Sequence, residues 1–294
     1  MMTPSMRRGF TLVELLISLV VTAIIGGALV SMLLNQARFM DQQEAWRGAR
    51  GVSRGGINRL MSDLRSVEAS GGLIAAAAGG QDFTVRVPYA FGVLCGSAAN
   101  IYTVSLLPVD SAMFAAPGYT GFALRNNTTG VYTYHPSNTL NLIGTTALCQ
   151  NGLYDSIHTL ASINGSPAGR VVNLTRNAGA MMPAPVRGSI VYLYRDIRYE
   201  FKASTAIPGR TGLYRTMVTG GSTEELATPF DATARVNFYV LNNTTAQAAV
   251  PAPLSNTRGL ELLLHGASER TPGGSAGPKV ANMTTSVFFE NRND

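Results

Sequence analysis

The chain of 294 residues is long enough to bury a sizeable core, and one or two domains would be ordinary for this length. Charged residues make up only 14% of it, and the 31 glycines and 14 prolines predict many turns and, beyond the N-terminus, short strands in preference to long helices. The formal net charge of +6 would suit nucleic acid or anionic lipid, but the arginines are scattered and no run of five or six basic residues occurs, so DNA is a disfavoured partner.

An uncharged apolar stretch of 20 residues, from Leu15 to Leu34, follows a short polar start. A helix of this length can cross a hydrocarbon core about 30 Å thick, so the sequence predicts a transmembrane helix over 10–34. Arg7 and Arg8 lie just before it, and positive charge favours the cytoplasmic side. We therefore expect a single-pass protein with a cytoplasmic N-terminus and most of its chain outside.

A secretory signal peptide is the main alternative, because it also has a basic start and an apolar middle. Its apolar region usually has about 7 to 15 residues, which is shorter than this one, and no convincing A-x-A-like cleavage site follows here. Glu14 is a further argument against it. A carboxylate in a membrane helix costs on the order of 2.5 to 3.5 kcal/mol, so it usually has a partner and a purpose.

The segment GFTLVE, from Gly9 to Glu14, and the apolar run behind it resemble the processing signature of type IV prepilins and type II secretion pseudopilins. In that family, a membrane-embedded prepilin peptidase cuts after the glycine and methylates the new N-terminal residue. The resemblance implies a leader peptide at 1–9, cleavage between Gly9 and Phe10, and N-methylation of Phe10. It also implies an assembly role for Glu14, which would meet the N-terminal amine of a neighbouring subunit.

Cleavage before Phe10 would create an ammonium group at the membrane end of the helix, and the Glu14 carboxylate is the nearest available countercharge. An ion pair is stronger in low dielectric than in water, but its desolvation cost can leave little net stability. We therefore expect Glu14 to set the axial register of the subunit in a helical assembly more than to add strength.

Apolar residues recur at steps of three and four within 35–70, which predicts an amphipathic continuation of the helix that packs on a sheet. Gly48, Gly51, Gly55 and Gly56 interrupt this pattern, and each costs about 1 kcal/mol relative to alanine inside a helix. We expect a Gly-rich break or a pliable segment near Gly48 to Gly56. The alternative is a plain loop between a membrane anchor and a separate domain.

Short β-branched or aromatic segments, bounded by Gly, Pro, Asn or Ser clusters, follow from about residue 81 onward and predict strands. Region 90–186 has weaker patterning and predicts insertions or a subdomain. The fold class is therefore expected to be α+β and pilin-like, with a long N-terminal helix packed on an antiparallel β-sheet and a periplasmic β-rich domain at 71–294. The predicted strands are 83–87, 101–107, 131–134, 170–174, 189–194, 197–201, 212–218, 235–241, 259–264 and 285–290.

Two cysteines, Cys95 and Cys149, are too few for a disulfide scaffold and lack C-x-x-C spacing. In an oxidising compartment they could form a disulfide, whose loop closure would be worth about 3 to 4 kcal/mol. The alternative is two unrelated buried thiols, and the sequence leaves both open.

A second, looser resemblance covers about a third of the chain. The segments IRYEF, GLYR, EELA, RVNFYV and RGLELLL, in that order between 197 and 264, are similar to blocks of PilW-like minor pilins and J-type minor pseudopilins. In those families the blocks are successive strands and one short connecting element. The chain length also fits a large minor subunit better than a compact major pilin.

Motifs for catalysis are missing from the sequence. The histidines His135, His158 and His265 are far apart and form no H-E-x-x-H arrangement, and no G-x-S-x-G elbow occurs. GGSAGPK at 273–279 lacks the spacing of a phosphate loop, and the acidic residues show no calcium-loop spacing. We therefore expect no catalytic residue, no cofactor and no metal.

These observations together predict a non-catalytic minor pilin or pseudopilin in the inner membrane, with its C-terminal domain in the periplasm. The expected partners are prepilin peptidase, other minor and major pilins or pseudopilins, the inner-membrane assembly platform and membrane lipid. The alternatives are a pilus-tip binding module for DNA or surfaces, acting through 90–186, and a membrane-anchored extracytoplasmic enzyme. The sequence does not distinguish a type IV pilus from type II secretion or DNA uptake, because all three use one processing signal.

Overall fold

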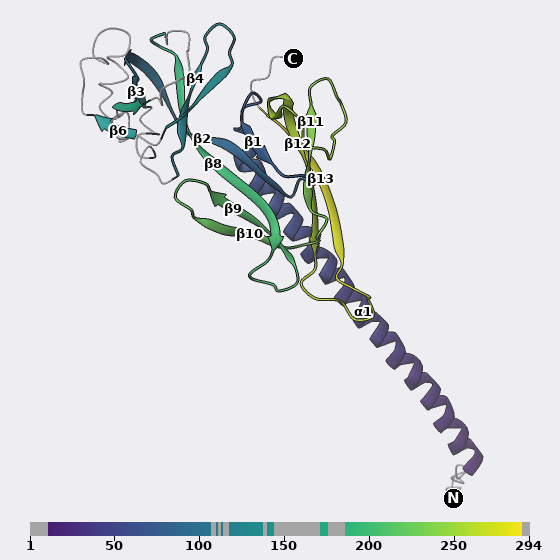
Figure 1. Cartoon of the computed structure of the whole chain (residues 1–294). Helices are drawn as coiled ribbons and strands as arrows, with labels where there is room; N and C mark the ends of the chain where they lie inside the picture. Colours follow the sequence, from purple (N-terminus) through teal and green to yellow (C-terminus); the bar gives the residue numbers. More distant parts are fainter. Residues whose placement is uncertain are drawn as a thin grey trace, which may run out of the picture.

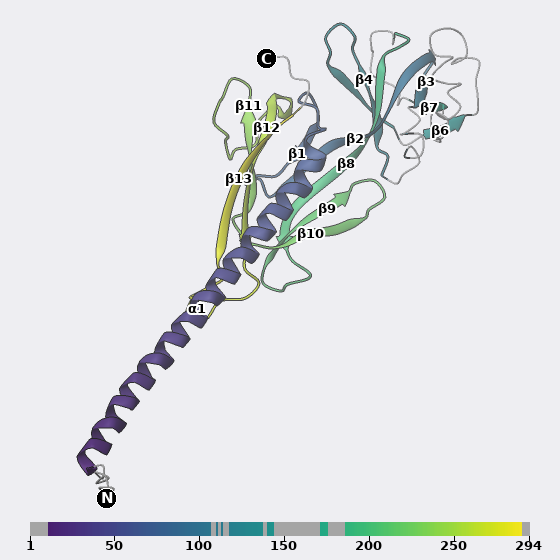
Figure 2. The same ribbon diagram turned by 180° about the vertical axis from the view of Figure 1, so that it is seen from behind.

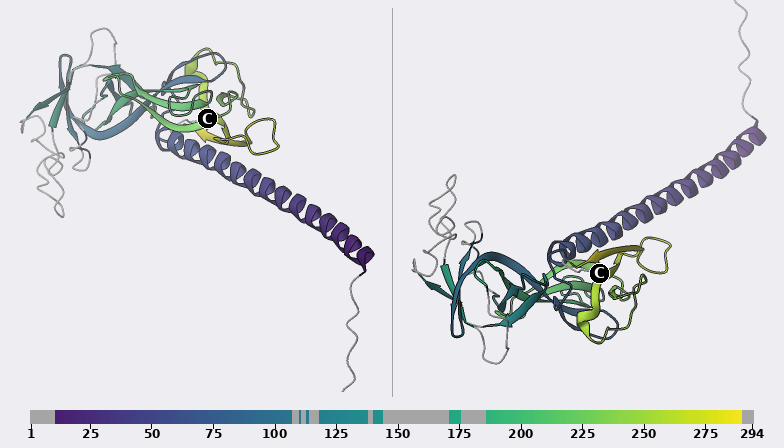
Figure 3. Two further views of the ribbon diagram at one scale, coloured as in Figure 1. Left: turned by 90° about the horizontal axis from the view of Figure 1, so that it is seen from below. Right: turned by 90° about the horizontal axis from the view of Figure 1, so that it is seen from above.

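The long helix α1 (Leu12–Leu64) projects from a large antiparallel sheet, and its C-terminal part lies on that sheet (Figures 1 and 2). The computed structural model describes residues 11–106, 110, 113, 118–137, 171–175 and 186–289, together with the backbone of 140–143. Seen from below and from above, the N-terminal part of α1 extends far beyond the strands (Figure 3). The architecture is α+β and consistent with a pilin-like fold, as the sequence predicted.

Thirteen strands form one hydrogen-bonded sheet among the described residues, and their pairings are antiparallel. The main path runs β11-β12-β10-β9-β8-β2-β3-β7-β6, with β1 on β2, β4 on β8, β5 on β4 and β13 on β12. A short 3-10 turn, η2 (Leu254–Asn256), precedes β12. The strands are β1 (Leu73–Ala76), β2 (Asp82–Ala98), β3 (Ile101–Leu106), β4 (Gly121–Arg125), β5 (Tyr132–Pro136), β6 (Leu140–Ile143), β7 (Val171–Thr175), β8 (Ile190–Ala203), β9 (Thr211–Met217), β10 (Thr223–Phe230), β11 (Arg235–Val240), β12 (Thr257–Ala267) and β13 (Val280–Phe288).

The two long strands β2 and β8 pair along most of their length and connect two hydrophobic cores. The first core lies under α1 and includes Leu60, Leu64 and Phe238. The second core, which includes Leu94 and Phe122, lies at the end of the sheet away from α1, among β2, β3, β4, β7 and β8 (Figure 1). The extra strands expected from region 90–186 thus enclose a core of their own.

The predicted helix break at 48–56 is wrong, because α1 runs without interruption from Leu12 to Leu64. Gly48, Gly51 and Gly55 lie on the exposed face, where an added Cβ would meet nothing within 4 Å. Gly56 faces the sheet, and its Cβ would lie 2.8 Å from Cζ of Phe230. Packing of the opposite face on the sheet outweighs the low helix propensity of these glycines, as is usual for helices in proteins.

Several predicted strand boundaries need correction. The segments predicted at 189–194 and 197–201 form the single strand β8, and the last strand begins at Val280 and ends at Phe288. The EELA segment lies within β10, whose composition is a poor strand signal but which pairs with β9. The strands β1, β4 and β6 were not predicted, because they are short and, unlike the equally short β5 and β7, contain few β-branched or aromatic residues.

Candidate functional site

The first turn of α1 is closed by a capping box between Thr11 and Glu14. The Thr11 hydroxyl accepts a hydrogen bond from the Glu14 backbone N–H at 3.3 Å. The Glu14 Oε2 accepts from the Thr11 backbone N–H and from the Thr11 hydroxyl, each at 3.0 Å. The T-x-x-E spacing of Thr11 and Glu14 is the ordinary sequence signature of this motif. Glu14 is therefore a local helix cap in the isolated subunit.

The apolar part of α1 has no protein partner within the described chain. Its large aliphatic residues from Leu12 to Leu34 are exposed, and the most apolar window is wholly unburied, which distinguishes it from the core helix of a soluble protein. The hydroxyls of Ser18, Thr22 and Ser31 bond to carbonyl oxygens of the same helix at 2.7 to 2.9 Å. This stretch is thus long and apolar, and its side-chain hydroxyls have hydrogen-bond partners within the helix, as is required of a helix in lipid.

Ser53 fixes α1 to the sheet at a point where helix and strands approach closely. Its buried hydroxyl accepts from the Gly266 N–H at 2.8 Å and can donate to the carbonyl oxygens of Leu264 at 3.0 Å or Ala281 at 3.2 Å. A Cβ at Gly266 would lie 2.2 Å from the Ala49 carbonyl oxygen. Small residues on both sides therefore allow one hydroxyl to bond to two strands.

A second polar contact holds the end of α1. Arg215 of β9 donates from Nε to Asp63 Oδ2 at 3.0 Å, and the Tyr199 hydroxyl of β8 donates to the same carboxylate. Burial and the neighbouring Asp63 carboxylate raise the pKa of Tyr199 well above its ordinary value, so the phenol stays protonated and remains a donor. Contacts of Ser53 and Asp63 therefore hold the C-terminal part of α1 on the sheet, and the exposed apolar part continues the same helix.

A match to a known family model lies at this N-terminus. Residues 4–30 match the prokaryotic N-terminal methylation motif, which covers the start of the chain, the Thr11–Glu14 cap and most of the apolar helix. The chain carries a type IV prepilin-like N-terminus. The match supports the type IV prepilin and pseudopilin-like family and does not distinguish one member from another. No curated protein and no solved structure matches the chain.

In this prepilin-like chain, the processing site itself lies outside the described residues, because Gly9 and Phe10 precede Thr11. Cleavage between them and methylation of Phe10 stay predictions from the sequence. Glu14 is described; it follows Phe10 by four positions in the sequence, and within the described residues its carboxylate accepts hydrogen bonds from Thr11. The helix and the motif are consistent with anchoring in the inner membrane.

The histidines and cysteines do not form a site together among the described residues. His135 is buried in the second core, stacked on Phe122 with ring centroids 5.0 Å apart, whereas His265 bonds to the Thr233 hydroxyl beside the first core. Cys95 is buried and disulfide-bonded, but Cys149 and His158 lie outside the described residues, so the Cys95–Cys149 pairing stays a prediction. Within the described part of the chain, no three His, Cys, Asp or Glu side chains are placed to hold a metal ion.

Glu225 has a strongly shifted pKa, but its contacts are those of a structural residue. Partial burial raises the pKa of its carboxyl, but hydrogen bonds from Ser204, Thr205 and Tyr214, joined by the Ala206 backbone N–H, outweigh that effect and lower the pKa to about 2. The carboxylate thereby closes the loop between β8 and β9. Its lone pairs are used within the fold, which argues against a catalytic role.

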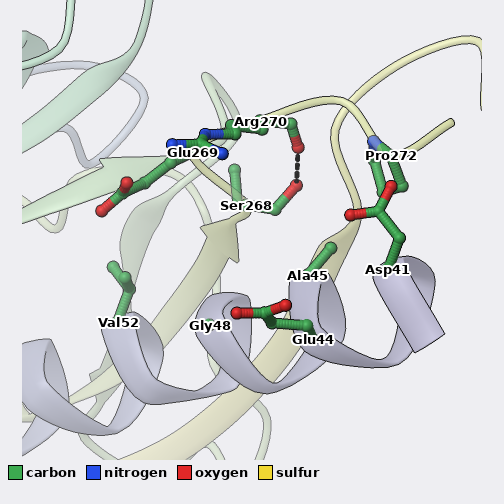
Figure 4. Close-up of a pocket in the computed structure, with 10 residues that line it drawn as sticks. Asp41, Glu44, Ala45, Gly48, Val52, Ser268, Glu269, Arg270 and Pro272 are labelled. Carbon is green, nitrogen blue, oxygen red and sulfur yellow. Dashed lines mark hydrogen bonds between the residues drawn. The ribbon is translucent and has the colours of Figure 1, made fainter.

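A cleft of about 330 Å³ lies between α1 and the loop that follows β12 (Figure 4). Asp41 and Glu44 line it from the helix, and Glu269 and Arg270 line it from the loop. Asp41 accepts from the Gly273 N–H at 2.8 Å, so it helps to hold the loop against α1. None of the residues that line the cleft forms a nucleophile–base pair.

Proposed function

We propose that this protein is a minor pilin or pseudopilin. Prepilin peptidase removes residues 1–9 and methylates Phe10, and the mature subunit enters a type IV pilus or type II secretion pseudopilus at its start or tip. One observation carries the proposal: the methylation motif at 4–30 overlaps the start of a helix of 53 residues whose apolar half has no partner among the residues that the structure describes.

The exposed half of α1 explains how one helix serves two environments. In the membrane its aliphatic side chains contact lipid, and in a fibre the same side chains would contact the helices of neighbouring subunits. Transfer between two apolar surroundings costs little hydrophobic free energy, because neither exposes the side chains to water. The β-rich part, at 71–294, is carried along through Ser53 and Asp63.

Glu14 would change partners during assembly. In the unprocessed chain its carboxylate caps α1 through Thr11. Cleavage places a new ammonium group at Phe10, one residue before Thr11, where this carboxylate or that of a neighbour can reach it. The ammonium group and the Thr11 donors then compete for the Glu14 carboxylate. Pairing of this carboxylate with the ammonium group of a neighbouring subunit would set the axial register between the two subunits.

The proposed role is assembly, and proteins with this motif are generally not enzymes. The neighbouring subunits are other minor and major pilins or pseudopilins, and the inner-membrane platform would extract the subunit from lipid with its C-terminal domain in the periplasm. A DNA- or surface-binding role of 90–186 finds no specific support in the part of this region that the structure describes, so it is not proposed.

Exchange of Glu14 for glutamine or alanine tests this role. Glutamine can still cap the helix but has no charge, whereas alanine removes both the cap and the charge. We expect Glu14→Gln to be processed and inserted normally, yet to fall at least about tenfold in sheared fibres, measured by immunoblot against the membrane fraction. Thr11→Ala is the matched control, because it removes the hydroxyl of the cap and keeps the carboxylate.

We expect Thr11→Ala to assemble like the wild type. Wild-type incorporation of Glu14→Gln, with poor incorporation of Glu14→Ala and Thr11→Ala, would show that Glu14 acts as a helix cap and has no electrostatic role in assembly.

A further inference from the structure

Strand β13 forms an edge of the sheet, since it pairs with β12 alone among the described residues. The Phe289 N–H donates to the Arg258 carbonyl at 2.9 Å, and the Lys279 carbonyl accepts from the Ser268 N–H at 2.8 Å. Odd-numbered residues of β13 therefore direct their N–H and C=O groups at β12, and even-numbered residues direct theirs outward. The outward residues are Val280, Asn282, Thr284, Ser286 and Phe288.

This edge lacks the usual protection against pairing with another chain. Its nine residues contain no charge and no proline, and the register with β12 shows no bulge. The edge of β11 differs, because the Val236 N–H donates to the Gly80 carbonyl at 2.8 Å and Phe238 exchanges two hydrogen bonds with Gln247. Figure 2 shows β13 beside α1 at the margin of the molecule, with no other strand beyond it.

The flank of α1 beside this edge carries arginines and no acidic residue. Gly56 lies against Phe230 of β10, and Asp63 accepts a hydrogen bond from Arg215 of β9. In the sheet, β10 and β9 lie on one side of β12 and β13 lies on the other, so these two residues mark the flank of α1 that faces away from β13. With about 100° per residue, Arg50 and Arg54 then lie on the flank toward β13. Both are exposed and neither forms a salt bridge among the described residues; Arg50 lies over the ring of Trp46 at 5.8 Å.

Acidic residues of this part of α1 lie elsewhere. Asp41 and Glu44 line the cleft that α1 forms with the loop after β12, and in Figure 4 their side chains are labelled there with Glu269 and Arg270. The carboxylates of this part of α1 thus lie on the cleft flank, where Arg38 also approaches the loop, whereas the flank toward β13 carries Arg50 and Arg54 without a carboxylate. A segment that pairs with β13 would place every second side chain toward α1, where Arg50 and Arg54 favour carboxylates.

The membrane anchor limits which segment can pair with this edge. Strand β13 runs alongside α1 in the same direction, since Ala281 near its start contacts Ser53 and the strand continues toward the end of the helix (Figure 2). Antiparallel pairing of β13 with β13 of a second copy would point the two anchors in opposite directions. Two subunits in one membrane cannot do this, so antiparallel pairing of two β13 strands does not fill the edge.

We propose that the edge of β13, together with Arg50 and Arg54, is a strand-addition site for an extended acidic segment of a neighbouring subunit. Backbone hydrogen bonds to the outward groups would provide affinity, and the arginines would select negative over positive charge. The identity of the neighbour as a fibre subunit rests on the proposed function, whereas the site itself does not.

A peptide-binding assay on the full-length protein in detergent micelles tests the site. The probe is a fluorescent nine-residue peptide of alternating valine and glutamate, and the control peptide has lysine in place of glutamate. We expect fluorescence anisotropy to show binding of the acidic peptide and at least about tenfold weaker binding of the basic one. The double variant Arg50→Glu/Arg54→Glu should reverse this preference.

Thr284→Pro and Thr284→Ala form the matched pair for the backbone. The outward N–H of Thr284 takes no part in the ladder with β12, so proline removes a free donor that alanine retains. We expect Thr284→Pro to weaken binding at least about tenfold and Thr284→Ala to bind like the wild type, with unchanged circular dichroism for both. If Thr284→Pro does not fold, an acidic peptide that is N-methylated at alternate residues blocks the same hydrogen bonds from the other side.

Three results would overturn the proposal. Unchanged binding of both the N-methylated peptide and Thr284→Pro would exclude strand addition. Displacement of the peptide by duplex DNA, with loss of DNA binding in the arginine variant only, would make the flank a nucleic-acid surface. Absence of peptide binding would refute the site even where processing of the chain and its dependence on Glu14 are as proposed.

Discussion

Gly55 and Gly56 are neighbours in α1, but they lie in different surroundings, and alanine should have opposite effects at the two positions. At Gly55 an added Cβ meets nothing within 4 Å, so Gly55→Ala should gain the full helix propensity of alanine, about 1 kcal/mol. At Gly56 the Cβ would lie 2.8 Å from Cζ of Phe230 and 3.3 Å from Cδ1 of Leu264. Overpacking of this kind costs about 1 to 3 kcal/mol.

The same propensity gain applies to both variants, so it cancels from their difference. Gly56→Ala should therefore be less stable than Gly55→Ala by about 1 to 3 kcal/mol, and less stable than or equal to the wild type. Thermal unfolding of the full chain in micelles, followed by circular dichroism, measures both, and Gly51→Ala is a second exposed control. Equal destabilisation by Gly55→Ala and Gly56→Ala would refute an uninterrupted helix with one packed face.

Two further predictions concern polar groups that hold the fold. Ser53→Ala removes the buried hydroxyl that accepts from the Gly266 N–H and can donate to the Leu264 or Ala281 carbonyl, so the free energy of unfolding should fall by about 1 to 3 kcal/mol in urea titration. A change below a few tenths would show that the hydroxyl is not needed. Glu225 has a pKa of about 2 in the folded state against an ordinary value of 4.5, so the carboxylate stabilises the fold above pH 4.5 and this contribution is lost as the pH falls from about 4.5 toward 2. Glu225→Gln should be less stable at neutral pH by about 1 to 2 kcal/mol and should lose less stability than the wild type over that acid range; parallel pH profiles would contradict the assignment.

The sequence was informative wherever a long or specific pattern carried the signal. The apolar run from Leu15 to Leu34 and the segment from Gly9 to Glu14 predicted the long helix and the prepilin-like N-terminus, and the family match at 4–30 supports both. Strongly β-branched or aromatic segments such as 235–241 and 259–264 were placed within one to three residues of β11 and β12.

Tertiary contacts decided the features that the sequence could not predict. Glycine has a low helix propensity, so the sequence alone predicts that Gly56 weakens the helix. In the structure, the absence of a side chain at Gly56 makes room for Phe230 of β10. Ser53 is an ordinary polar residue in the sequence, and its role depends on strands more than 200 positions later in the chain. The capping role of Glu14 was the exception, because its local spacing was readable from Thr11.

Intact-mass and N-terminal analysis of the protein from membranes, with and without prepilin peptidase, tests the central claim most directly. The account predicts a mature chain that begins at N-methylated Phe10 and lacks residues 1–9, found only when the peptidase is present. An unprocessed chain in both strains, or cleavage at any other bond, would contradict it.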